Sequence, residues 1–149
     1  MKNPAVIEAA KLLRLHGHYV FDDWISPGAN TDAHWMEYEQ ARGRTYLEAL
    51  DGKHVNNVFQ FDKNNIDDAD IVVLMLPCGK SAHLELGYAI GTGKPGHIIL
   101  NGDEPWEVMY KFATVWPSIE AFVAELDLKA SWVYDLNRRA WINEKEWRV

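Results

Sequence analysis

An unbroken run of six apolar residues at positions 71–76 constrains the fold of this chain more than any other feature. Such a run is typical of a strand buried on both faces, as in a parallel sheet that helices cover on either side. A turn over residues 77–80 follows, and Ser81 begins an expected helix that ends near Ile90. Residues 97–100 form the next expected strand. Strands that alternate with helices predict a three-layer α/β fold.

The rest of the chain extends this alternation. We expect helices at residues 4–16, 33–50, 105–112 and 118–126, a short helix or turn at 62–69, strands at 18–21 and 114–116, and a loop at 24–32. These segments make one domain over residues 1–128, which is an ordinary domain size. Residues 129–149 form a tryptophan-rich C-terminal extension, in which alternating apolar positions predict a hairpin. This hairpin either packs over the domain's own core or forms a surface shared with a second subunit.

The composition excludes several classes of protein. With 48% hydrophobic and 25% charged residues, the chain is typical of soluble globular proteins. Its single cysteine excludes a disulfide scaffold and fits a reducing cytoplasm, and no apolar run reaches the ~18 residues of a membrane span. A net charge of −7 disfavours nucleic acid polymers as partners, because affinity for them rests on lysine and arginine. The six histidines lack metal-binding spacing, so we expect neither a metal nor a cofactor.

The junction between the buried strand and the helix after it is the expected place for chemistry. In open parallel sheets, ligands bind outside the carboxyl ends of the strands. The free backbone N–H groups at a helix start favour an anion. Here the turn contains Gly79 and Lys80, and Ser81 either caps the helix or donates its hydroxyl to a phosphate. We therefore expect Gly79, Lys80 and Ser81 to bind an anionic group of the substrate.

Two carboxylates could serve this junction. Glu85 lies four residues after Ser81, so both share one helical face, and the helix dipole favours its ionised form. An ionised carboxylate can capture a sugar's anomeric carbon when a glycosidic bond breaks. Asp62 precedes the buried strand and could protonate or position the leaving base. The alternatives from spacing alone are an ordinary first-turn acid for Glu85 and a helix cap for Asp62.

Four other side chains are weaker candidates. Trp24 and Trp35 flank the loop expected over the pocket, where they could stack on a base or pack as a lid. His83 shares the helix of Glu85 and is expected to pack at the rim of the site. No histidine has a compelling pairing with Cys78, so we do not expect it to be a nucleophile.

These motifs together resemble the nucleoside 2-deoxyribosyltransferase superfamily. The resemblance covers residues 5–100, and its strongest part is residues 62–95. It consists of an aspartate, Asp62, then Ala69-Asp70 with the apolar strand, a loop of small residues, Glu-Leu-Gly-Tyr-Ala at 85–89 and Gly-Lys-Pro at 93–95. The superfamily swaps nucleobases between nucleosides or splits nucleoside 5′-monophosphates, and it is distantly related in fold to domains that cleave NAD.

The resemblance implies a role for each matching residue. Glu85 matches the glycosyl-enzyme nucleophile, Asp62 the aspartate that contacts the nucleobase, and residues 79–81 the loop that holds the sugar's 5′-hydroxyl or 5′-phosphate. It also implies a flavodoxin-like fold and a homodimer or higher homo-oligomer. The chain departs from the family at Gly79, where transferases often carry an acid and monophosphate hydrolases a serine. It also opens almost directly on a helix, so the family's usual first strand is missing from the expected sheet.

We therefore expect an enzyme that cleaves or transfers the N-glycosidic bond of a nucleoside or a nucleoside 5′-monophosphate, with Glu85 as nucleophile and Asp62 serving the base. Two alternatives remain. The first is an NAD-type glycohydrolase that uses the same glutamate. The second is a non-catalytic nucleotide-binding or assembly protein of the same fold, which the missing first strand favours.

Overall fold

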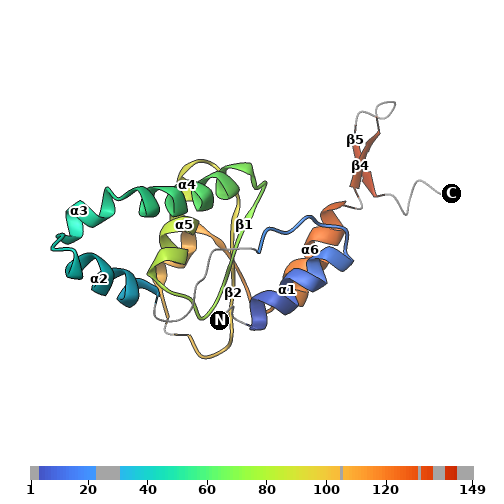
Figure 1. The fold of residues 1–149 in the computed structure, drawn as a ribbon. Coiled ribbons are helices and arrows are strands. Elements are labelled where there is room, and N and C mark those ends of the chain that lie inside the picture. The colour runs from blue at the N-terminus through green and yellow to red at the C-terminus, as the bar shows by residue number, and fades with distance from the viewer. Residues whose placement is uncertain (1–3, 23–30, 105, 131, 136–139, 144–149) are drawn as a thin grey trace.

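A computed structural model describes residues 4–22, 31–104, 106–130, 132–135 and 140–143 of the chain. The elements in chain order are α1 (Pro4–Leu15), α2 (Thr31–Ala41), α3 (Tyr46–Leu50), α4 (Lys53–Asp68), β1 (Val72–Met75), α5 (Lys80–Gly91), β2 (Gly96–Ile99), the 3₁₀ helix η1 (Val108–Phe112), β3 (Thr114–Trp116), α6 (Ile119–Ala130), β4 (Trp132–Asp135) and β5 (Ala140–Asn143). Figure 1 shows this arrangement. The predicted α/β fold is confirmed.

The sheet of the domain has three parallel strands in the order β1-β2-β3. Val72 is level with Gly96, and His97 is level with Thr114. Parallel neighbours need a crossover connection, which α5 provides between β1 and β2. The carboxyl ends of β1 and β2 therefore lie at one edge of the sheet, and the α5 N-terminus follows directly from the end of β1.

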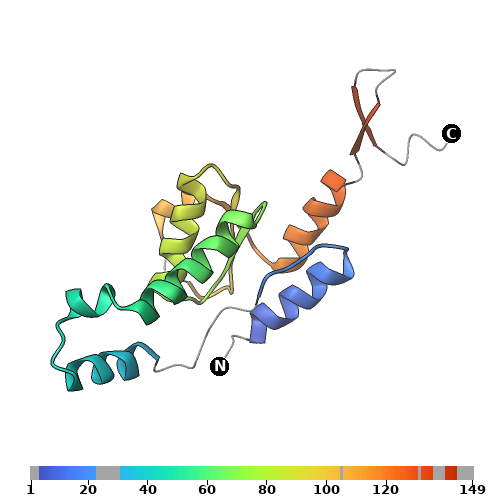
Figure 2. The same ribbon diagram turned by 45° about the horizontal axis from the view of Figure 1, so that its top comes forward.

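Helices cover both faces of the sheet, as the apolar run predicts. On one face, Leu13 of α1 and Phe122 and Val123 of α6 pack with Ile99. On the other face, Leu86 of α5 packs with Leu74, Leu76 and Ile98. Figures 1 and 2 show α1 and α6 together on one side of the strands, and α4 and α5 on the other. Burial of these side chains drives folding.

The edge of β1 is open, as expected for a flavodoxin-like sheet without its usual first strand. Residues 18–22 were predicted to contain a strand, but they form no strand in the structure. A cavity of about 470 Å³ lies between this segment and β1, and α1 forms part of its wall. Because the cavity separates residues 18–22 from β1, no ladder forms between them, and no other described strand pairs with this edge.

Three helix predictions were wrong in extent. The helix expected over residues 33–50 is two helices, because Gly43 adopts a left-handed φ of 71° and Thr45 starts α3 with a capping box to Glu48. The short element expected near residue 62 is instead the 16-residue α4. The helix expected over 105–112 is only the 3₁₀ turn η1.

Lys94 ties α4 to the turn before β2. Its ammonium group donates to the backbone carbonyls of Asp67 at 2.7 Å and Ala69 at 2.8 Å, at the C-terminal end of α4. A cation is favourable there because the last carbonyls of a helix have no partner within the helix. The Gly-Lys-Pro motif therefore has a structural role in holding α4 against the sheet.

The predicted C-terminal hairpin is confirmed. Strands β4 and β5 pair antiparallel, with Tyr134 level with Trp141. In both views the hairpin extends from the end of α6 and away from the three-stranded sheet, so it does not cover the core (Figures 1 and 2). An isolated two-stranded hairpin is marginally stable in water.

Candidate functional site

Asp62 and Glu85 come together from two neighbouring helices. Asp62 lies on α4 and Glu85 on α5, and these helices pack against each other. Both residues are half-buried. Burial raises the pKa of the Glu85 carboxyl, and the nearby charge of Asp62 raises that pKa further. The two carboxylates that the sequence singled out thus form one electrostatic pair.

The Asp62 carboxylate is incompletely hydrogen-bonded. Its Oδ1 atom is buried and has no hydrogen-bond partner within the described part of the chain. Burial raises the pKa of Asp62 as well. A buried carboxylate oxygen without a partner is costly. Such a cost is commonly retained at functional sites, where a ligand supplies the missing hydrogen bond.

The helix dipole does not dominate at Glu85. The sequence suggested that a position within roughly the first turn would favour the ionised carboxylate. In the structure α5 begins at Lys80, so Glu85 is its sixth residue. The dipole acts mainly within the first turn, and burial outweighs it, so the pKa of Glu85 is raised.

The turn before α5 has the geometry of an anion site. Gly79 is the N-cap residue in extended conformation, with φ −89° and ψ −177°, and it offers no side-chain cap. Ser81 is therefore not the cap that the sequence suggested, since it lies one residue inside the helix. Gly79, Lys80 and Ser81 are all exposed. Their backbone amides stand at the start of a 12-residue helix, with no capping side chain of the described residues in the way.

His83 connects this turn to Tyr110 of η1. Its Nδ1 lies 2.9 Å from the Gly79 carbonyl oxygen and 3.5 Å from the Cys78 sulfur, and its Nε2 lies 3.1 Å from the Tyr110 hydroxyl. A carbonyl only accepts, so Nδ1 carries the hydrogen and Nε2 accepts from Tyr110. The two rings stack with centroids 5.9 Å apart. The His83 side chain thus connects the turn before α5 with the 3₁₀ helix η1.

Cys78 is not set up as a nucleophile. Burial and the nearby charge of Glu85 raise the pKa of the Cys78 thiol, so the thiol form is favoured. The Nδ1 atom of His83 donates to the Gly79 carbonyl and cannot also accept the thiol proton. We expected no histidine to pair with Cys78, but the structure places the Nδ1 atom of His83 3.5 Å from its sulfur.

The two tryptophan predictions have different outcomes. Trp24 lies outside the described residues. Trp35 lies on α2, with its ring edge-to-face against Tyr46 at 6.0 Å between centroids. Its indole Nε1 is buried and has no hydrogen-bond partner within the described ranges. Its described ring contact is therefore packing between α2 and α3, and it stays a candidate for base stacking only as a prediction.

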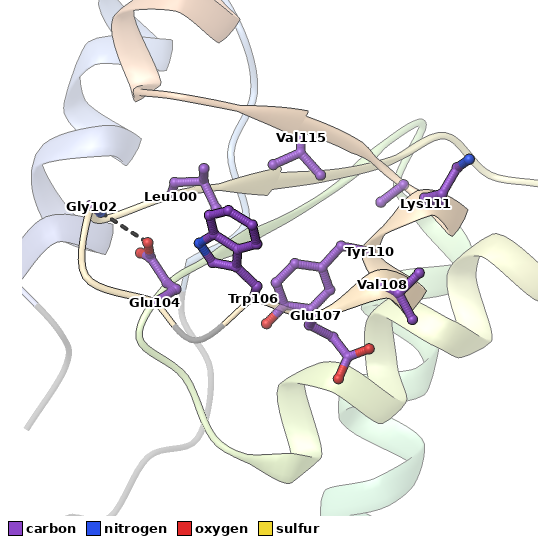
Figure 3. Close-up of a pocket in the computed structure, with 10 residues that line it drawn as sticks. Leu100, Gly102, Glu104, Trp106, Glu107, Val108, Tyr110, Lys111 and Val115 are labelled. Atoms are coloured by element: carbon purple, nitrogen blue, oxygen red, sulfur yellow. Dashed lines mark hydrogen bonds between the residues drawn. The ribbon is translucent and has the colours of Figure 1, made fainter.

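A cavity of about 620 Å³ opens next to Tyr110, and sequence reasoning missed it (Figure 3). Trp106 and Tyr110 line it together with apolar side chains and with Glu104, Glu107 and Lys111. These residues belong to the segment after β2, whereas the sequence motifs end at Pro95. The clustering of Trp106, Tyr110 and Lys111 around a short helix was the available signal.

Two features, a metal-binding cluster and a membrane-spanning helix, are absent from the described residues. Within the described ranges, no three His, Cys, Asp or Glu side chains gather as a metal would require. None of the helices in the described part has the length and apolar character to cross a bilayer. No protein-family model matches the sequence, and no curated protein matches it either.

Proposed function

We propose that this protein cleaves or transfers the N-glycosidic bond of a nucleoside or a nucleoside 5′-monophosphate. The observation that carries the proposal is the pairing of Asp62 and Glu85, two half-buried carboxylates close enough for one charge to raise the pKa of the other. Pairs of carboxylates with perturbed pKa values divide nucleophile and acid roles in glycosidic chemistry. The resemblance of residues 62–95 to the deoxyribosyltransferase superfamily supports the same chemistry.

In the proposed reaction, the ionised Glu85 carboxylate attacks the anomeric carbon C1′. The C1′–N bond breaks, its electron pair leaves with the base, and Asp62 delivers or positions a proton for the departing nitrogen. The product is a glycosyl ester on Glu85. Water, or a second base, then attacks C1′ and releases the Glu85 carboxylate, which completes hydrolysis or transfer.

The turn before α5 would hold the other end of the substrate. Backbone amides of residues 79–81 can donate to a 5′-hydroxyl or 5′-phosphate, and the exposed Lys80 adds a positive charge. Residues 79–81 and Glu85 belong to the start and the middle of the same helix, so the distance between them is fixed by the helix geometry. A substrate whose 5′ end binds at the turn would therefore have its C1′ oriented towards the Glu85 carboxylate.

One observation favours the non-catalytic alternative. At the sheet edge where the superfamily has its first strand, no strand of the described residues pairs with β1, and a cavity of about 470 Å³ lies beside it. A domain with this edge open could bind a nucleotide without turning it over.

We propose further that the protein acts in the cytoplasm, on a small-molecule substrate, as a homodimer or higher homo-oligomer to which the hairpin contributes.

An assay of base release tests the proposal. The protein is incubated with nucleosides, their 5′-monophosphates and NAD, and free base is measured by chromatography. We expect release that Glu85→Gln abolishes and that Asp62→Asn reduces. The exposed Glu37 of α2 gives a matched control, since Glu37→Gln should leave release unchanged. Tight nucleotide binding by the wild type without any release would contradict the proposed activity and select the non-catalytic alternative.

A further inference from the structure

The geometry points to the cavity beside η1 as a second base subsite, so that the substrate extends past its 5′-phosphate to another aromatic base, as in a dinucleotide. This inference rests on the proposed function, because that function places C1′ at Glu85 and the 5′ end at the turn before α5. It names a substrate class that the sequence motifs do not assign to residues beyond Pro95.

A chain of contacts from the turn to the cavity carries the inference. Asp62 lies on α4 and Glu85 on α5, and the turn containing Gly79 leads into the same helix as Glu85. His83 lies between that turn and Glu85 in the sequence of α5, and its ring contacts the Gly79 carbonyl through Nδ1 and the Tyr110 hydroxyl through Nε2. Tyr110 lines the cavity. A ligand whose phosphate lies at the turn would therefore have the cavity next to it, on the side of His83.

The cavity has the size and lining of a site for a planar aromatic group. Its volume of about 620 Å³ falls within the usual ~300–1,000 Å³ of small-molecule pockets. Figure 3 shows Trp106 and Tyr110 next to each other at the cavity, with Leu100 and Val115 behind them. The Trp106 side chain is fully exposed, at 103% of its reference area. A stacked base would remove this large apolar ring from water.

The Tyr110 ring is already held in place for such a contact. Its hydroxyl donates to His83 Nε2, and its ring stacks on the imidazole with an interplanar angle of 19°. The side chain therefore loses little freedom when a base packs against it. Tyr110 is a positioning residue in this account, and Trp106 supplies the stacking face.

The charges of the lining favour an amino-bearing base joined to a phosphate. Glu107 places a carboxylate at the cavity that can accept a hydrogen bond from an exocyclic amino group such as that of adenine, although one of its oxygens also accepts from the Met109 N–H. The Glu104 carboxylate accepts from the backbone N–H groups of Asn101 and Gly102 and holds the loop of the cavity in place. Lys111 is the cation of the same lining and supplies a positive charge for a phosphate. No ion pair within the described ranges involves Lys111.

Matched ligand pairs test the inference. Nicotinamide mononucleotide and NAD differ by one adenosine monophosphate unit, as do adenosine monophosphate and P1,P2-di(adenosine-5′) diphosphate. Titration calorimetry with the Glu85→Gln variant measures binding without turnover. We expect the longer member of at least one pair to bind at least 10-fold more tightly. The Trp106→Ala substitution should weaken binding of the longer member by about 5- to 150-fold, the range for one stacked base, and leave the short member unchanged.

The control variant is Phe112→Ala. Phe112 lies in η1 and is exposed like Trp106, but it does not line the cavity. It should leave both members of each pair unaffected. Equal affinity for long and short members, or an equal loss in Phe112→Ala and Trp106→Ala, would overturn the inference. Base release from mononucleotides without any gain from the second unit would overturn this inference alone, whereas dinucleotide binding through Trp106 without release would contradict only the proposed activity.

Discussion

Replacing Glu85 by glutamine should stabilise the protein while it abolishes the proposed chemistry. Burial and the charge of Asp62 both raise the pKa of the Glu85 carboxyl in the folded state. A raised folded-state pKa means that the folded protein binds this proton more tightly than the unfolded chain. Stability from this group is therefore present at low pH and is lost as the pH rises through the folded-state pKa. Glutamine carries no charge and avoids that loss at neutral pH.

The size of the gain follows from where the side chain lies. Each pKa unit of difference between folded and unfolded states corresponds to about 1.4 kcal/mol. Glu85 is only half-buried, so solvent screens part of the unfavourable interaction. We therefore expect a gain of about 0.5–1 kcal/mol at pH 7, at the lower end of typical stabilising substitutions. For a chain of 149 residues this corresponds to a rise in Tm of about 1–4 °C.

Thermal unfolding at several pH values measures this gain. The difference in Tm between Glu85→Gln and the wild type should be positive at pH 7 and should vanish near pH 4, where the carboxyl group is largely protonated in both states. The control Glu37→Gln changes an exposed carboxylate of α2 and should show no such pH-dependent gain. A Glu85→Gln protein that is less stable than the wild type at pH 7 would refute the reasoning about the half-buried pair of carboxylates.

Three further substitutions test the fold. Phe122→Ala empties the centre of the core and should lower the free energy of unfolding by about 3–5 kcal/mol in urea titrations, since Phe122 is 1% exposed. Gly96→Ala would place a Cβ atom 2.6 Å from Ile90 Cγ1 and should cost about 1–3 kcal/mol in the same assay. Lys94→Met removes two charged hydrogen bonds at the end of α4 and should cost about 1.5 kcal/mol, with faster amide exchange in the last turn of α4. An unchanged midpoint in any of the three would contradict the packing described.

The sheet, the helices α1, α5 and α6 and the C-terminal hairpin could be predicted from the sequence. The apolar run at 71–76 predicted a strand buried on both faces; helices do pack on both faces, but of the β1 residues only Leu74 is buried and the other three are half-buried. The strands β2 and β3 followed from the same alternation. Residues 18–21 failed as a strand for a reason outside their own sequence, because a strand exists only where a neighbour pairs with it. The break between α2 and α3 was readable in principle, since Thr45 and Glu48 have the spacing of a capping box.

Helix α4 shows why the element that carries Asp62 could not be predicted in full from the sequence. Val55, Val58, Asp62 and Ile66 all fall on its less exposed side, at helical spacing. An aspartate in that row interrupts the apolar pattern, so the periodic signal covered only a short segment. The carboxylate that makes Asp62 a candidate site residue is therefore also the reason that the length of its helix could not be predicted. Functional positions commonly break local rules in this way.

The cavity beside η1 was beyond prediction for a different reason. Its lining comes from a loop, a short 3₁₀ helix and the start of β3, which show no shared periodicity. The contact that links it to the carboxylates, from His83 to Tyr110, spans 27 positions of the chain. Helical spacing predicts that Ser81 and Glu85 share one face, but it cannot predict that Tyr110 lies near the same helix.

Trapping of the glycosyl-enzyme ester tests the central claim most directly. The protein is incubated with 2′-deoxy-2′-fluoro-arabinonucleosides and their 5′-monophosphates, in which fluorine slows breakdown of the ester, then quenched in acid and analysed by intact and peptide mass spectrometry. We predict a fluorosugar adduct on the peptide that contains Glu85, and no adduct in Glu85→Gln. Base release that proceeds with the adduct on another residue, or with no adduct in any member of the series, would contradict Glu85 as the nucleophile.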